Sequence, residues 1–273
     1  MENEEDSVVG RTLHYLEAKR GSDDLIVFLH GLGLDANDFR PYMAESRFHC
    51  LALTLYGFDA TEREDRYKPI SLQAHVEVLA YALRKIKKMY PRKRLSLVGF
   101  SFGADMVFFL SRYTPDVLDE LDLHRAVLLD PNANSTTTTI SARIAKMTPD
   151  RALPELVEML KSATDITEFR YLCEYLYKIT AKNFAQIHRH ATEVVAMWAD
   201  ASHEPFLNYI GLLNRHSNGI HVVFSFHYER LFNTIAHRAG LRGLDTDSFQ
   251  CATSDHFELI GPTFLKQQLE GVV

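Results

Sequence analysis

The sequence predicts an α/β fold in which a mostly parallel sheet is flanked by helices. Short continuous apolar runs, which are typical of strands buried on both faces, lie at 25–29, 50–55, 94–99, 125–130 and 220–224. Helical patterns separate most of these runs, and such alternation indicates a doubly wound sheet. The length of 273 residues suits one large domain that carries an insertion better than two independent domains.

The remaining elements follow from local patterns. Residues 11–20 alternate loosely and are expected to form one or two opening antiparallel strands. Ser71 is a candidate N-cap for a long helix that ends near residue 90, because apolar residues then recur at helical spacing. Near the C-terminus we expect a helix over 231–239, a strand over 248–252 and a closing helix over 262–269.

The alternation stops between residues 132 and 219. This stretch contains no convincing strand and shows a series of amphipathic helical patterns after a polar, threonine-rich run at 135–139. We therefore predict a core domain made of residues 1–131 and 220–273. Residues 132–219 are expected to form a helical cap that sits over the strand ends.

Composition excludes several classes of protein. A net charge of -6 and an isoelectric point near 6.1 argue against a nucleic-acid partner, which would require clustered positive charge. The acidic start lacks the layout of a secretory signal, and no apolar run approaches the roughly 18 residues of a membrane span. We expect a soluble cytoplasmic protein without a membrane partner.

Cys50, Cys173 and Cys251 lack paired spacing, which predicts buried reduced thiols.

The pentapeptide Gly99-Phe100-Ser101-Phe102-Gly103 joins an apolar strand to an apolar helix. A serine on such a sharp turn has a strained backbone and an exposed hydroxyl, and the small flanking residues let strand and helix pack closely. The N–H of Phe102 then lies at a helix N-terminus, where negative charge is favoured. The motif alone is common, but its strand and helix context indicates that Ser101 is a nucleophile.

A serine nucleophile needs a base and an acid that orients it. His256 follows the last predicted strand and is the preferred base among the 13 histidines. For the acid we favour Glu229, which follows the strand at 220–224 in a predicted loop. Asp130, at the end of the preceding strand, is the alternative.

The loop after the first buried strand is a candidate oxyanion site. Its sequence is His30-Gly31-Leu32-Gly33, and the two glycines allow a close approach of the backbone. We expect the N–H of Leu32 to join that of Phe102 in binding an oxyanion. His30 is expected to orient this loop rather than to take part in chemistry.

These motifs, in this order, resemble the α/β-hydrolase superfamily over nearly the whole chain. The resemblance implies an α/β-hydrolase fold with a helical cap inserted after the sixth strand, and a catalytic set of Ser101, His256 and Glu229. It also implies oxyanion donation by Leu32 and Phe102. The chain departs from many members at Phe226 and Asp255, where glycine is frequent, and in having glutamate rather than aspartate as the favoured acid.

The expected function is hydrolysis of a small to medium acyl ester or thioester through an acyl-enzyme on Ser101. No cofactor and no metal are implied, and the expected partner is a small-molecule acyl substrate. An acyltransferase, a carbon–carbon bond hydrolase and a non-catalytic ligand-binding homologue are the alternatives. The sequence leaves the substrate and the oligomeric state open.

Overall fold

The computed structural model describes residues 13–59, 68–148, 152–163 and 165–273. Within them, seven strands form one sheet, in which β1 pairs antiparallel with β3 and every other pairing is parallel. The strands in sheet order are β1 (His14–Ala18), β3 (His49–Thr54), β2 (Asp24–Leu29), β4 (Arg94–Phe100), β5 (Arg125–Leu129), β6 (Ile220–Phe224) and β7 (Phe249–Cys251). The predicted fold class is confirmed. Residues 11 and 12 of the expected opening strand lie outside the described residues.

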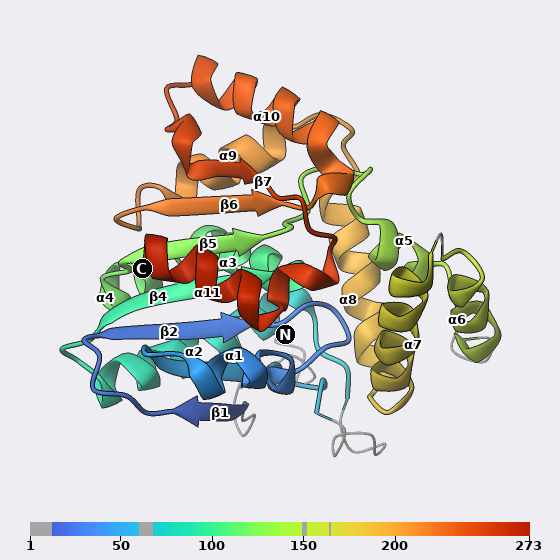
Figure 1. Cartoon of the computed structure of the whole chain (residues 1–273), viewed down its shortest axis with the longest axis horizontal. Helices are drawn as coiled ribbons and strands as arrows, with labels where there is room; N and C mark the ends of the chain where they lie inside the picture. Colours follow the sequence, from blue (N-terminus) through green and yellow to red (C-terminus); the bar gives the residue numbers. More distant parts are fainter. Residues whose placement is uncertain (1–12, 60–67, 149–151, 164) are drawn as a thin grey trace, which may run out of the picture.

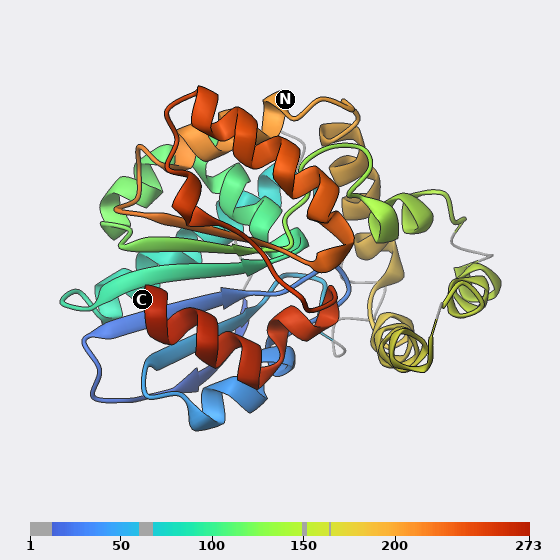
Figure 2. The same ribbon diagram turned by 45° about the horizontal axis from the view of Figure 1, so that its top comes forward.

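Helices cover both faces of the sheet (Figures 1 and 2). On one face lie α1 (Arg40–Glu45) and α11 (Pro262–Val272), and on the other lie α2 (Leu72–Met89), α3 (Phe102–Tyr113) and α4 (Pro115–Leu121). Helix α10 (Glu229–Leu241) packs beside β7. Short 3-10 helices connect these elements: η2 (Ala36–Phe39), η5 (Phe226–Tyr228), η6 (Thr246–Ser248) and η7 (Phe257–Ile260). Both faces of the central strands are therefore buried.

Among the described residues, five further helices lie between β5 and β6 in the chain. They are α5 (Thr139–Ala145), α6 (Ala152–Leu160), α7 (Ile166–Thr180), α8 (Phe184–Met197) and α9 (Glu204–Leu213). Helices α5 to α8 lie beyond the carboxyl ends of the parallel strands (Figure 1). Helix α9 instead packs on α3, where the rings of Phe206 and Phe108 lie 5.6 Å apart. It thus extends the helical layer on that face of the sheet.

Buried polar contacts attach α8 to the core. The side chain of Gln186 accepts from the N–H of Ile70 at 2.7 Å and donates to its carbonyl at 3.0 Å. His75 of α2 and His190 of α8 are both fully buried, with Nδ1 and Nε2 respectively 2.6 Å apart. Because buried polar groups are costly without partners, these pairs fix where α8 docks.

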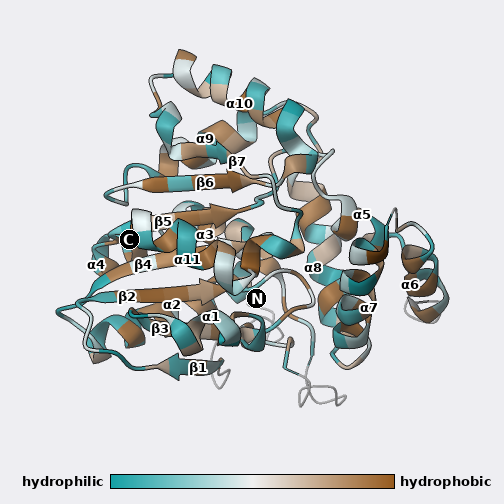
Figure 3. Cartoon of the chain, viewed as in Figure 1, coloured by the Kyte–Doolittle hydropathy of each residue, from teal (hydrophilic) through white to brown (hydrophobic). Residues whose placement is uncertain are grey.

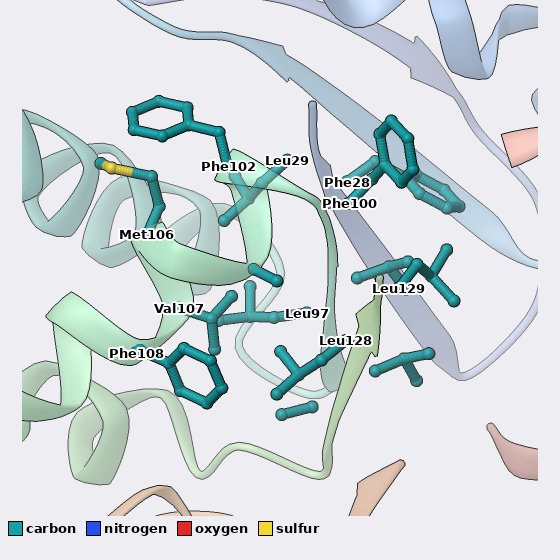
Figure 4. Close-up of a cluster of buried hydrophobic side chains, with 14 of the residues drawn as sticks. Phe28, Leu29, Leu97, Phe100, Phe102, Met106, Val107, Phe108, Leu128 and Leu129 are labelled. Carbon is teal, nitrogen blue, oxygen red and sulfur yellow. The ribbon is translucent and has the colours of Figure 1, made fainter. Parts of the chain in front are cut away.

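The apolar core lies between the sheet and its helices. Brown colouring covers much of β2 and β5 in Figure 3, and β2 and β3 are buried at every position. In Figure 4, Phe102 and Met106 of α3 extend to one side of β4, while the rings of Phe28 and Phe100 lie on the other. Cys50 is buried as expected, whereas Cys173 and Cys251 are half-buried; all three thiols are free.

Candidate active site

Ser101 lies at the carboxyl edge of the sheet, on the turn between β4 and α3. Its backbone has φ 51° and ψ -117°, a left-handed conformation that is rare and strained for a residue with a side chain. The turn is held by hydrogen bonds at both ends. The N–H of Ser101 donates to the carbonyl of Leu129 at 2.8 Å, and its carbonyl accepts from the N–H of Ala104 at 2.8 Å. The strained serine is thus fixed by the sheet and by the first turn of α3.

The two motif glycines are required for close packing rather than for a special φ. A Cβ on Gly103 would lie 2.1 Å from the carbonyl oxygen of Leu29, which is backbone of the neighbouring strand. A Cβ on Gly99 would lie 2.6 Å from the carbonyl oxygen of Gly103. Neither contact can be relieved by turning a side chain. Helix α3 can therefore start this close to β2 and β4 only with glycine at both positions.

Asp130 follows β5 and is bonded to His256. The His256 Nδ1–H donates to Asp130 Oδ2 at 2.6 Å. The carboxylate also accepts from the N–H of Ser225 at 2.8 Å and from its hydroxyl at 2.9 Å. Asp130 is itself in the left-handed region, with φ 47°, and its side chain is fully buried. Because Nδ1 is bound to the carboxylate, Nε2 is the imidazole nitrogen left to act as a base.

The prediction that Glu229 orients His256 is corrected by this geometry. Glu229 is the exposed first residue of α10, and no hydrogen bond or ion pair joins its side chain to His256 among the described residues. The expected loop is instead the single turn η5, which leads directly into the helix. A carboxylate in the first turn of a helix is favoured by the helix dipole, which explains Glu229 without a role in the site.

Ser101, Asp130 and His256 line one cavity of about 810 Å³ at the carboxyl edge of the sheet. Its outer walls come from α5, α6 and α7, and from residues 225–228 and 255–258. Within the described part of the chain, no hydrogen bond joins the Ser101 hydroxyl to His256. Bonds of this kind are often loose before a substrate is bound. A cavity of this volume suits a small or medium organic ligand.

A second, smaller cavity adjoins Ser101 on the side of the loop after β2. It measures about 20 Å³ and is lined by Gly31, Leu32, Ser101 and His256, among others. This volume is close to that of a single oxygen-sized group. The N–H groups of Leu32 and Phe102 have no acceptor in the described residues. Of the two predicted oxyanion residues, Leu32 therefore lines the same small cavity as Ser101 and His256.

His30 is a fully buried structural residue. Its Nδ1–H donates to the carbonyl of Gly31 at 2.8 Å, and its Nε2 accepts from the N–H of Leu55 at 3.0 Å. Burial is the main cause that lowers the pKa of His30 to about 4, and the charge of Lys182 acts in the same direction. A neutral imidazole with both nitrogens occupied supports the loop and is not a base.

Sequence reasoning missed two groups around the site. Ser225 donates to Asp130 from its backbone N–H and from its hydroxyl, but nothing in the sequence distinguishes it from the other serines. Asp105 of α3 is fully buried and accepts from Asn132 at 2.6 Å and from the indole N–H of Trp198 at 3.1 Å. It thereby ties the helix after Ser101 to the chain after Asp130 and to the end of α8. An aspartate within the apolar run 104–110 was the available signal.

The chain matches a family model described as "Alpha/beta hydrolase family" over residues 26–237. It belongs to the alpha/beta hydrolase family. The match begins in β2 and ends in α10, and so includes the loop of Leu32, the turn of Ser101, and Asp130. His256 lies beyond the matched residues.

Solved structures share this α/β-hydrolase fold. A thermophilic esterase from Thermogutta terrifontis has 16% identity and a TM-score of 0.65, with 95% of this chain and 93% of that chain covered. MenH from S. aureus has 12% identity and a TM-score of 0.64, with 95% and 97% covered. AqDC, studied for recognition and ring-cleavage of the Pseudomonas quinolone signal, has 13% identity and a TM-score of 0.67, with 95% of each covered. At these identities the likeness establishes the fold alone.

Among the described residues, no group of three or more histidine, cysteine or acidic side chains is placed to hold a metal ion. In the same part of the chain, no helix has both the length and the apolar character to span a membrane.

Proposed function

We propose that this alpha/beta hydrolase is a serine hydrolase that cleaves a carboxylic ester or thioester of a small to medium acyl group. The observation that carries the proposal is the placement of three groups around one cavity. Ser101 is strained at its edge, His256 shares the cavity, and Asp130 is bonded to the far nitrogen of that imidazole. Such an arrangement is suited to activating a serine hydroxyl as a nucleophile.

In the proposed reaction the Ser101 hydroxyl oxygen attacks the acyl carbon and His256 Nε2 takes its proton. The carbonyl oxygen becomes an oxyanion that accepts hydrogen bonds from the N–H groups of Leu32 and Phe102. The bond to the leaving alcohol or thiol then breaks, and His256 returns the proton to that group. Asp130 keeps its hydrogen bond to Nδ1 throughout and stabilises the imidazolium.

Water completes the cycle on the acyl-enzyme. It loses a proton to His256 Nε2 as it attacks the acyl carbon, and the same two N–H groups receive the second oxyanion. The Ser101–acyl bond breaks, the acid leaves and Ser101 recovers its proton. Residues 132–219 are proposed to act as a cap in this reaction, with α5, α6 and α7 supplying the walls against which the acyl group is bound.

A substrate panel tests this proposal. Esters and thioesters of graded acyl length are offered to the wild type and to Ser101→Ala, with and without an added alcohol or amine acceptor. We expect turnover of at least one member, a fall of about 10⁴-fold or more in kcat for Ser101→Ala, and free acid as the main product. Unchanged turnover in Ser101→Ala would refute the proposal, and product formed on the acceptor instead of water would make the protein an acyltransferase.

A further inference from the structure

The end of α7 contacts the loop that carries Leu32. The Tyr175 hydroxyl donates to the carbonyl of Leu32 at 2.9 Å, and the Lys182 ammonium, in the turn after α7, donates to the carbonyl of Gly33 at 2.9 Å. Both side chains are buried, although they come from a segment more than 140 residues away in sequence. Two consecutive carbonyls of the loop after β2 are thus held by the inserted helices.

The peptide group before Leu32 is held by other donors. The carbonyl of Gly31 accepts from His30 Nδ1–H at 2.8 Å and from the N–H of Leu34 at 3.1 Å. This carbonyl and the N–H of Leu32 belong to one trans peptide and point in opposite directions. Holding the carbonyl therefore directs the N–H of Leu32 away from His30. The direction of this N–H therefore depends on two contacts. His30, a buried core residue, holds the carbonyl of the same peptide group, and Tyr175 holds the carbonyl of the next one.

Packing and charge make this contact specific. Gly33 has φ 79°, and a Cβ at this position would lie 2.8 Å from the Ile179 side chain, so α7 packs directly on the loop backbone. Lys182 also forms an ion pair with Asp35 at 2.8 Å, and Asp35 caps η2 by accepting from the N–H of Asn37 at 2.8 Å. Although burial acts to raise the pKa of Asp35, Lys182 and Asn37 outweigh it and lower the pKa to about 2. The loop is therefore bonded to Lys182 at two points.

We propose that Tyr175 and Lys182 are positioning residues for the oxyanion donor Leu32. In this view the oxyanion site is complete only when the end of α7 is docked on the core. The segment that walls the acyl cavity then also sets the donor geometry, which links ligand enclosure to catalytic competence. This inference rests on the proposed serine-hydrolase function, since it assigns a task to two residues within that reaction.

The test compares Tyr175→Phe and Lys182→Met with a matched control, Lys178→Met. Lys178 lies in α7 and pairs with Asp38 of η2, but in the part of the chain that the structure describes it has no hydrogen bond to the loop carbonyls. Each variant is titrated with a fluorophosphonate to count active sites. Its kcat and KM for the best ester, and its inhibition constant for a trifluoromethyl ketone analogue, are then measured per active site. The ketone forms a tetrahedral adduct whose oxygen occupies the oxyanion site.

We expect Tyr175→Phe and Lys182→Met to lower kcat by about 10- to 100-fold with KM changed less than about twofold. Ketone binding should weaken by a similar factor, and Lys178→Met should change none of these values more than about twofold. A purely structural role would reduce the titrated fraction and leave the values per active site unchanged, which would overturn the inference. A wild type that neither reacts with the fluorophosphonate nor hydrolyses any ester would instead refute the proposed function.

Discussion

The Nδ1–H of His256 donates to Oδ2 of Asp130 over 2.6 Å, and the same carboxylate is held by both donors of Ser225. Asp130 follows β5 and Ser225 follows β6, which are neighbouring strands of the sheet. The orientation of the imidazole is therefore set by the sheet rather than by a surface loop. An imidazole held in one tautomer by buried groups has the geometry that a base acting through Nε2 would need.

The first prediction separates the two candidate acids. Asp130→Asn should lower kcat for ester hydrolysis by about 10³- to 10⁴-fold, because an amide next to Nδ1 favours the tautomer with its proton on Nε2. Glu229→Gln should leave kcat within about twofold, because that side chain is exposed on α10. Steady-state kinetics measure kcat for both variants, and circular dichroism confirms that both are folded. A larger loss in Glu229→Gln than in Asp130→Asn would restore Glu229 as the acid.

The second prediction concerns the close approach of α3 to the sheet. Gly103→Ala should destabilise the protein by about 3 kcal/mol or more, because the new methyl group would meet the carbonyl of Leu29 at 2.1 Å. Gly211→Ala is the matched control. It lies in α9 with nothing within 4 Å of the added carbon, and should stabilise the protein by about 0.5–1 kcal/mol. Urea denaturation of both variants checks the pair, and equal effects would contradict the packing argument.

The third prediction is a pH dependence of stability that arises at Asp105. Burial raises its pKa to about 8, against the hydrogen bonds from Asn132 and Trp198, which act to lower it. In the unfolded chain the pKa of an aspartate is about 3.9. The native state thus binds this proton more tightly. The resulting stabilisation is complete below about pH 4 and is lost as the pH rises towards 8.

Asp105→Asn removes this titration. Relative to the wild type, its free energy of unfolding should therefore increase by about 2–4 kcal/mol between pH 5 and pH 8. Urea denaturation of both proteins at the two pH values measures the difference, and the absolute stability at either pH is not needed. A difference between variant and wild type that stays constant across this range would show that Asp105 does not bind its proton more tightly in the native state.

The fold and the sharp turn at Ser101 were predictable because their signals are local. Apolar runs gave the strands, and the pentapeptide around Ser101 required a sharp turn with glycine at both flanks. The choice between Asp130 and Glu229 as the partner of His256 could not be made from local sequence signals. It depended on the positive φ of Asp130, on Ser225 in the next strand, and on a single 3-10 turn in place of a longer loop.

The contacts of α7 with the loop after β2 were even harder to predict from the sequence. Lys182 is one of 30 basic residues, and a lysine between two helical patterns would ordinarily be exposed. It is buried because α7 docks on the loop after β2, where the carbonyl of Gly33 and the carboxylate of Asp35 accept its hydrogen bonds. Such a contact depends on tertiary packing between segments far apart in the chain, and periodicity within either segment carries no information about it.

The proposed covalent role of Ser101 can be tested by mass spectrometry of the protein after reaction with a fluorophosphonate. We expect one adduct, located by peptide mapping on Ser101, with a labelling rate that falls at least about 100-fold in Asp130→Asn and no adduct in Ser101→Ala. A wild type that remains unlabelled, or an adduct on another residue that forms equally in Ser101→Ala, would contradict a nucleophilic Ser101 served by His256 and Asp130.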